Sequence, residues 1–339
     1  MNILYLIEPT FFDMHLNGAR IPVFLHMLRA LRDGARVQAF ENSQKYAVSA
    51  DFNAATMDAA FMSVIKKPTN NDRRFDLAVV QKGQPSAALQ HYVITDIALM
   101  LNDPRSRQAA NQLHELLSGR FGLDAYRVSA PWRYVKGRRR DLADMLEYDI
   151  VYVQSEVEKQ ALEKIGSGKG AKIEVFKNSA VTIDLFPDIV RSRVAGSRTK
   201  KFLLPVPPGI RREREYARFL GSLADSPDLL ADLTVLSDPK FARHIPSVAE
   251  HASHVEDFQK FLEEFDCVLV PTKHYTGLNN RVFQAACGGC QLIASPEALT
   301  GLIPGHPVLE TAPKSFQAFK DKMKSFPEGS VAPEIVLSL

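Results

Sequence analysis

The most informative segment of this chain is FDCVLVPTKHYTGLNNRVFQAACGGCQLIAS, which covers residues 265–295. It is typical of an apolar strand, a polar loop containing Gly277, a helix starting near Asn279, a Gly-Gly stop and a second strand. Such a loop presents backbone N–H groups at the amino end of the helix, where anions bind. Arg281 stands in the first helical turn, where a cation is unfavourable for the helix dipole. We therefore expect a bound anion, such as a diphosphate, at this turn.

The same alternation extends on both sides of this segment. The expected strands are Ile3–Ile7, Val37–Phe40, Leu77–Val80, Ala98–Leu101, Ile150–Val153, Ile173–Phe176, Phe202–Val206, Leu233–Leu236, Cys267–Val270 and Gln291–Ala294. The expected helices are 21–31, 43–64, 105–118, 138–147, 155–165, 212–223, 255–264, 279–287 and 314–326. Short apolar strands that alternate with amphipathic helices indicate an α/β fold, with parallel sheets covered on both faces.

The length of 339 residues suits two domains. A polar, aperiodic stretch at 187–200 separates the two halves of the pattern. We predict an N-terminal Rossmann-like domain over 1–186, an interdomain crossing over 187–200, a C-terminal Rossmann-like domain over 201–312, and a helix and tail over 313–339. Ligands bind at the carboxyl ends of strands in such sheets, so the expected site is a cleft across which the domains face each other.

The composition excludes several classes of protein. Hydrophobic residues make up 45% and charged residues 24%, as in ordinary globular proteins. A net charge of +3 does not indicate nucleic acid as a partner, and three cysteines favour a reducing cytosol over a disulfide framework. No apolar run approaches the ~18 residues of a membrane helix. We predict a cytoplasmic protein; a peripheral contact with the inner face of the membrane and a homo-oligomer stay open.

A basic run, Lys136–Arg140, is favoured as a solvated helix start, with contact to phosphate or an anionic surface as the alternative. Trp132 and Tyr134 precede it, and a core role is favoured for them over an acceptor surface. Gly18 lies in the loop after the first strand, where a glycine lets a ligand approach the backbone. A plain turn is the alternative for this loop.

The central segment resembles the donor-binding motif of group 1 glycosyltransferases, which have the two-domain GT-B fold. The matching residues, in the family's order, are Asp266, Val268–Val270, Pro271-Thr272, Gly277, Ala285–Gly288 and Ile293–Ser295. Residues 281–289 are closest to the spore-maturation branch of the family. Further matches are 148–156, 172–178, 184–186, and the strand 202–206 followed by Arg211, Arg212 and Arg214.

The resemblance implies a hexosyltransferase that moves a sugar from a nucleoside diphosphate to an acceptor with retention at the anomeric carbon. The acceptor would be a glycan, a lipid-linked molecule or a protein. The expected donor-binding residues are Gly18, Arg212, His274, Gly277, Leu278, Asn279, Asn280, Arg281 and Gln284, and the expected catalytic residues are His15 and Thr276. Neither a metal nor a cofactor is expected, because Arg212, Arg281 and the helix terminus would neutralise the leaving diphosphate. A solvent-facing histidine is the alternative for His274, and His15 is expected to face the cleft as the base for the acceptor.

The chain departs from the family at two glutamates that lie eight positions apart. Thr276 and Gln284 occupy those positions. In the family the helix glutamate accepts hydrogen bonds from the ribose hydroxyls. A glutamine also accepts a hydrogen bond, but it lacks the negative charge that strengthens such a bond. A catalytically reduced binding or scaffold subunit is therefore the alternative function, and a sugar-nucleotide epimerase is a third. Cys287 and Cys290 lack two further metal ligands at a suitable spacing and are expected to serve packing.

Overall fold

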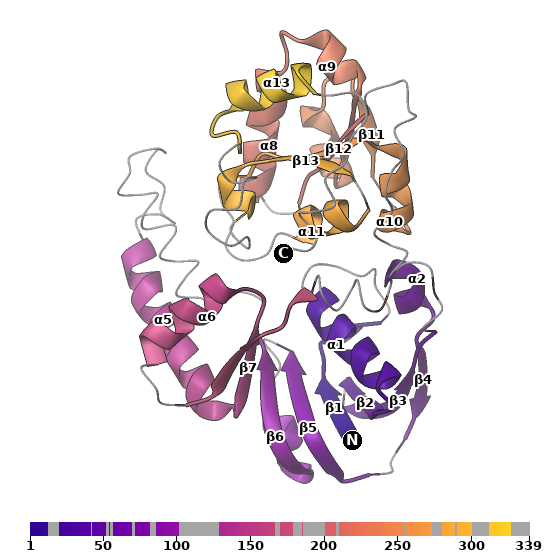
Figure 1. The fold of residues 1–339 in the computed structure, drawn as a ribbon, viewed down its shortest axis with the longest axis vertical. Coiled ribbons are helices and arrows are strands. Elements are labelled where there is room, and N and C mark those ends of the chain that lie inside the picture. The colour runs from indigo at the N-terminus through magenta and orange to yellow at the C-terminus, as the bar shows by residue number, and fades with distance from the viewer. Residues whose placement is uncertain are drawn as a thin grey trace. The chain divides into compact units, whose positions relative to one another are not determined.

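The computed structural model describes residues 1–12, 20–41, 43–51, 54, 57–69, 72–81, 86–101, 129–166, 170–178, 185, 201–207, 210–253, 255–272, 280–288, 290–299 and 312–326. The chain divides into two compact units, unit 1 (Met1–Leu185) and unit 2 (Phe186–Leu339), and Figure 1 shows their elements. The predicted crossing and tail fall largely outside the described residues, so the finer division and the shared cleft stay predictions.

Unit 1 is built on an eight-stranded sheet in the order β4-β3-β2-β1-β5-β6-β7-β8. Its strands are β1 (Asn2–Leu6), β2 (Arg36–Glu41), β3 (Gln44–Ser49), β4 (Ile65–Pro68), β5 (Arg74–Gln81), β6 (Val93–Met100), β7 (Ile150–Val153) and β8 (Lys172–Val175). Its helices are α1 (Ile21–Arg32), α2 (Met57–Met62), η1 (Ser86–His91), α5 (Ala130–Glu147) and α6 (Glu156–Gly166). The pairs from β2 through β1 to β8 are parallel. The predicted parallel sheet is therefore confirmed for most of its width.

The predicted helix over 43–64 is wrong. Its first part is β3, which pairs antiparallel with β2 and with β4, and among the described residues of this stretch only Met57–Met62 is helical. The hairpin register sets Glu41 opposite Gln44, and Ser43 between them has φ 64°, the left-handed conformation that tight hairpins need. Tyr46 and Val48 are good strand formers, and their alternate spacing was the overlooked signal.

Helix α1 and helix α5 start where their prolines fit. Pro22 and Pro131 lie in the first turn of each, where the missing N–H group costs nothing. The start of α5 at Ala130 therefore precedes the predicted start at 138. Helix α1 ends at Arg32, and Gly34 just beyond it has φ 79° and donates its N–H to the Leu31 carbonyl at 3.0 Å.

Unit 2 has a five-stranded parallel sheet in the order β11-β10-β9-β12-β13. Its strands are β9 (Phe202–Pro205), β10 (Leu233–Leu236), β11 (Glu250–Ala252), β12 (Cys267–Val270) and β13 (Gln291–Ala294). Its helices are α8 (Ile210–Ser222), α9 (Pro227–Ala231), η3 (Pro239–His244), α10 (Phe258–Phe261), η4 (Leu262–Glu264), α11 (Asn280–Cys287), η5 (Pro296–Leu299) and α13 (Phe316–Lys324). The predicted strands of this half are confirmed, and Phe319 and Met323 of α13 complete its core.

Candidate functional site

The strand order of unit 2 reverses between β9 and β12. From β9 the chain runs outward through β10 and β11, and it then returns to the other side of β9 for β12 and β13. Open α/β sheets bind ligands at the carboxyl ends of the two strands that flank such a switch point. Helix α8, with Arg212 in its first turn, follows β9, and α11 follows β12 after the segment 271–279. The segment predicted to bind the donor therefore begins at the carboxyl end of β12, at the switch point.

Arg281 and Gln284 meet on one side of α11. The Arg281 Nη1 donates to Gln284 Oε1 at 3.5 Å, and the guanidinium carbon lies 4.4 Å from the centre of the Phe258 ring. Gln284 is 4% exposed, and Arg281 is half-buried. Stacking on an aromatic ring holds a guanidinium in place while its edge keeps N–H donors. The Arg281 cation is thus held near the amino end of α11 by an aromatic ring and a neutral amide.

The end of β12 is anchored by buried polar contacts. Thr272 Oγ1 donates to Glu215 Oε2 of α8 at 3.3 Å, and the Ser295 hydroxyl donates to the Thr272 carbonyl. The Ser295 N–H donates to the Val270 carbonyl at 3.0 Å. These contacts tie β12, β13 and α8 together at Thr272, the last described residue before the predicted donor-binding stretch.

The far end of α11 packs tightly against η4. A Cβ on Gly288 would lie 3.0 Å from Leu262 Cδ1, closer than ordinary side-chain contact. Cys290 is buried, and its Sγ donates to the carbonyls of Leu262 and Phe265, both at 3.4 Å. Burial raises the pKa of the neighbouring Cys267 thiol well above its usual value. Cys290 therefore packs against backbone, as predicted, and Cys287 is described by its backbone alone.

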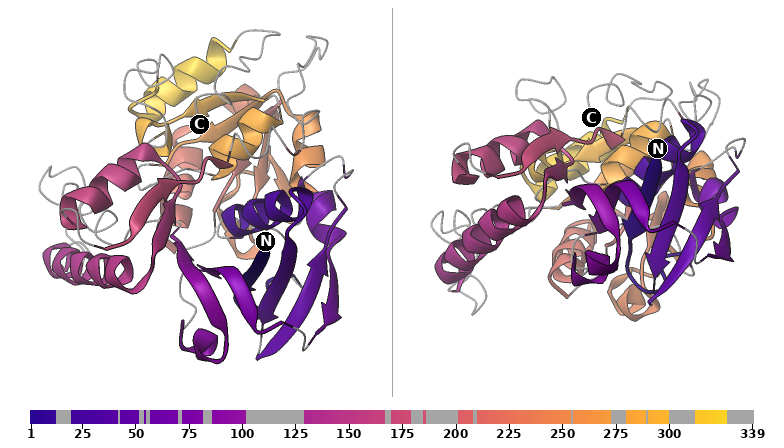
Figure 2. Two further views of the ribbon diagram at one scale, coloured as in Figure 1. Left: turned by 60° about the horizontal axis from the view of Figure 1, so that its bottom comes forward. Right: turned by 90° about the horizontal axis from the view of Figure 1, so that it is seen from below.

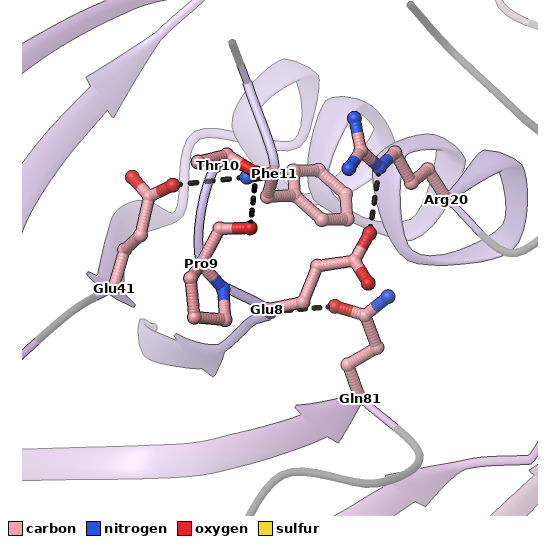
Figure 3. Close-up of polar contacts among 7 residues, drawn as sticks. All are labelled: Glu8, Pro9, Thr10, Phe11, Arg20, Glu41 and Gln81. Carbon is pink, nitrogen blue, oxygen red and sulfur yellow. Dashed lines mark hydrogen bonds and ion pairs between the residues drawn. The ribbon is translucent and has the colours of Figure 1, made fainter. Parts of the chain in front are cut away.

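Unit 1 has a switch point of its own, between β1 and β5, because the chain runs from β1 to β2 on one side and returns to β5 on the other. Three polar residues follow the strands there: Glu8 after β1, Gln81 at the end of β5 and Glu41 at the end of β2. Gln81 Oε1 accepts the Glu8 N–H at 2.8 Å, which joins the two strand ends (Figure 3).

Arg20 enters this cluster from the start of α1. Its Nε lies 2.6 Å from Glu8 Oε1, and its guanidinium carbon lies 5.6 Å from the Phe11 ring centre (Figure 3). The Arg20 side chain is 3% exposed, whereas that of Glu8 is 34% exposed. Glu41 accepts the Phe11 N–H at 2.9 Å and pairs with Lys66 at 3.0 Å. The buried cation thus fixes a partly exposed carboxylate at the carboxyl edge of the sheet.

The predicted site residues divide into three groups. Arg281 and Gln284 are described with their side chains, and the structure brings them together. Arg212 and Asn280 are described by their backbone alone, in the first turns of α8 and α11. The others lie outside the described residues: His15, Gly18, His274, Thr276, Gly277, Leu278 and Asn279.

Sequence reasoning missed Glu8, Gln81 and Glu41 in unit 1, and Glu215 in unit 2. The available signal was that Glu8 and Gln81 are the first polar residues after apolar runs that form strands, and that Glu41 directly follows the predicted strand Val37–Phe40. Across the described ranges, His, Cys, Asp and Glu side chains do not gather in threes as metal ligands would. No helix in the described part of the chain has the length and apolar character needed to cross a membrane.

Neither a protein-family model nor a curated protein matches the sequence. The structure is similar to Alr3699/HepE of Anabaena, solved in complex with UDP-glucose, with a TM-score of 0.53, 12% identity, and coverage of 99% of this chain and 94% of that one. Sucrose-phosphate synthase of Thermosynechococcus elongatus has a TM-score of 0.56 at 12% identity, over 96% of this chain and 89% of that one. WaaG, a glycosyltransferase involved in lipopolysaccharide biosynthesis, has a TM-score of 0.54 at 12% identity, over 96% and 90%. These likenesses show the fold, an α/β chain of the GT-B class with two Rossmann-like units, as predicted.

Proposed function

We propose that the chain is a group 1 glycosyltransferase that moves a hexose from a nucleoside-diphosphate sugar to an acceptor. Unit 2 binds the donor and unit 1 faces the acceptor, which is a glycan, a lipid-linked molecule or a protein. Transfer proceeds with retention and without a metal or cofactor. The similarity to proteins solved with UDP and with UDP-glucose supports a nucleotide sugar as the partner.

One observation carries this proposal: the segment predicted to bind the diphosphate follows β12 at the switch point of unit 2. Parallel strands place their carboxyl ends at one edge, so α8 and α11 both start near the position where ligands bind. Arg281 adds a fixed cation in the first turn of α11. Its charge, together with the N–H groups of the turn, offsets the charge that develops on a leaving diphosphate.

The first prediction is that nucleoside diphosphates or their sugars stabilise the protein in the absence of metal. At a ligand concentration of 100 Kd the gain in free energy of unfolding is about 2.7 kcal/mol. Thermal shift against a panel of nucleotides and nucleotide sugars, with and without EDTA, measures it. Unchanged melting temperatures across the whole saturating panel contradict the proposal, and a gain that EDTA abolishes contradicts its metal-independent form.

The second prediction concerns Arg281→Ala, which is expected to weaken nucleotide-sugar binding roughly tenfold to a hundredfold, because a hydrogen bond to a charged group contributes about 1.5–3 kcal/mol. Calorimetric titration measures the affinity. Arg218→Ala is the matched control, since Arg218 is an exposed arginine of unit 2 on α8. Equal affinities for Arg281→Ala and the control contradict the proposed donor site.

A binding or scaffold subunit is the second candidate function, and the observation that favours it is the neutral Gln284. Its amide oxygen contacts Arg281, where the family has a charged glutamate for the ribose. In an active transferase, Gln284→Glu keeps or tightens binding and Gln284→Leu weakens it by about 0.5–1.5 kcal/mol. Calorimetric titration of both variants measures the change. Flat affinities for both, with no turnover of any donor, favour the scaffold.

A further inference from the structure

Helix α5 of unit 1 exposes an apolar stripe along its outer side. The side chains that form this stripe, with their exposed fractions, are Trp132 (64%), Val135 (51%), Leu142 (36%) and Leu146 (65%). Their spacing by three, seven and four residues sets them on one side of the helix. The buried residues Gly137, Asp141 and Met145 recur every fourth residue on the opposite side. The helix therefore packs by one side and presents large apolar side chains to its surroundings by the other.

Basic residues surround the stripe. Lys136, Arg138, Arg139 and Arg140 are all exposed, and the Lys136 ammonium lies 4.8 Å from the centre of the Trp132 ring. Two of the three acidic residues of the helix lie away from the stripe, since Asp141 is buried and Asp144 is half-buried on the packed side. Glu147 is exposed, but it is the last residue of the helix. The outer side thus combines apolar bulk with positive charge.

We propose that the outer side of α5 binds an anionic lipid surface, with Trp132, Val135, Leu142 and Leu146 in the interface and the arginines and Lys136 on the headgroup phosphates. Amphipathic helices bind membranes in this way, when an apolar side with a tryptophan is bordered by Lys and Arg. Charge complementarity selects this occupant, because each basic residue close to an anionic leaflet adds to the attraction. Figures 1 and 2 show α5 beside α6 at the end of the sheet that carries β7.

The surface contains neither switch point, so its test is independent of the proposed transfer reaction. Trp132 is the single tryptophan of the chain and therefore reports directly on the stripe. The full chain is mixed with vesicles of phosphatidylcholine alone, or of phosphatidylcholine with phosphatidylglycerol. We expect a blue shift of the tryptophan emission, and co-sedimentation, with the anionic vesicles, and weaker binding at high salt.

Two variants separate the charge from the apolar stripe. Replacing Arg138, Arg139 and Arg140 by glutamine is expected to weaken partitioning about a hundredfold, since each basic residue contributes about 1 kcal/mol. Leu146→Ser keeps the Trp132 reporter and is expected to weaken it about tenfold. The matched controls are Lys240, Lys260 and Lys314 replaced by glutamine, which removes the same charge, and Val93→Ser, which removes an exposed apolar side chain of unit 1.

Several results would overturn the proposal. An emission spectrum unchanged by anionic vesicles would do so, even if α5 then proved to bind another protein. Binding that the controls weaken as much as the α5 variants would place the contact elsewhere on the molecule. Equal binding to neutral and anionic vesicles would remove the role assigned to the basic residues.

Discussion

Glu8→Ala is expected to lower the free energy of unfolding of unit 1 by about 3 kcal/mol. Glu8 contacts Arg20 at 2.6 Å, and the Arg20 side chain is 3% exposed. Without the Glu8 carboxylate, the buried Arg20 cation loses the counter-charge that it contacts, and water does not replace it. The effect lies at the low end of the range for buried pairs, because Glu8 itself is 34% exposed. Urea denaturation, with hydrogen exchange of β1 and α1 to assign the loss to unit 1, measures it.

The controls for this variant follow from the geometry in Figure 3. Glu8→Gln keeps an oxygen that accepts from Arg20 but removes the charge, so a smaller loss is expected. The double variant Glu8→Leu/Arg20→Leu removes both charges of this pair, so much of the loss should be recovered. If Glu8→Ala unfolds at the same urea concentration as the wild type, the pair has no role in holding the switch point of unit 1.

Acidification is expected to destabilise unit 1 through His26. This residue of α1 contacts the Tyr5 hydroxyl through Nδ1 at 2.6 Å, and its ring lies 5.3 Å from that of Tyr152 and 5.4 Å from that of Phe176. Burial, helped by the charge of Arg29, lowers the pKa of His26 from 6.5 to about 4. The folded protein therefore keeps His26 neutral at pH values where the unfolded chain protonates it.

The direction of the effect and its pH range follow from the difference in the pKa of His26 between the folded and unfolded states. Below pH 6.5 the unfolded state binds a proton at His26 and the folded state does not, so the free energy of unfolding falls as the pH falls. The loss of stability grows between pH 6.5 and about 4 and reaches about 3 kcal/mol, which is the free-energy equivalent of the difference in pKa. Urea denaturation at a series of pH values measures it, with carboxyl groups contributing in the lower part of the range.

A matched pair of variants isolates His26 from the other titrating groups. His26→Gln supplies an amide oxygen for the Tyr5 hydroxyl in place of Nδ1 and does not titrate, so its loss of stability between pH 6.5 and about 4 should be smaller by about 3 kcal/mol. His91→Gln, at the exposed end of η1, should keep the wild-type loss. Identical pH profiles for His26→Gln and the wild type would mean that another group causes the acid sensitivity.

The local pattern of the sequence determined much of the fold. Strands such as Cys267–Val270 and Gln291–Ala294 were predicted to their last residue, because a buried parallel strand is an uninterrupted apolar run. Arg281 and Gln284 were both assigned to the donor site, and they contact each other because residues three apart on a helix lie on the same side. Each of these inferences needs only a short window of sequence.

Other features depend on residues that lie far apart in the sequence, so only the tertiary structure determined them. The antiparallel β3 lies inside a stretch predicted as helix, because Ser43, with φ 64°, allows a hairpin whose partner strand is β2. Glu8 and Gln81 meet only because β1 and β5 are neighbours in the sheet, and Phe258 reaches Arg281 from a separate helix. Trp132 was expected in the core, yet its side chain is 64% exposed, because Gly137, Asp141 and Met145 take the packed side of α5. The order of the strands and the side of a helix that packs depend on which distant segments of the chain bury their apolar surfaces against each other. Local periodicity alone does not determine them.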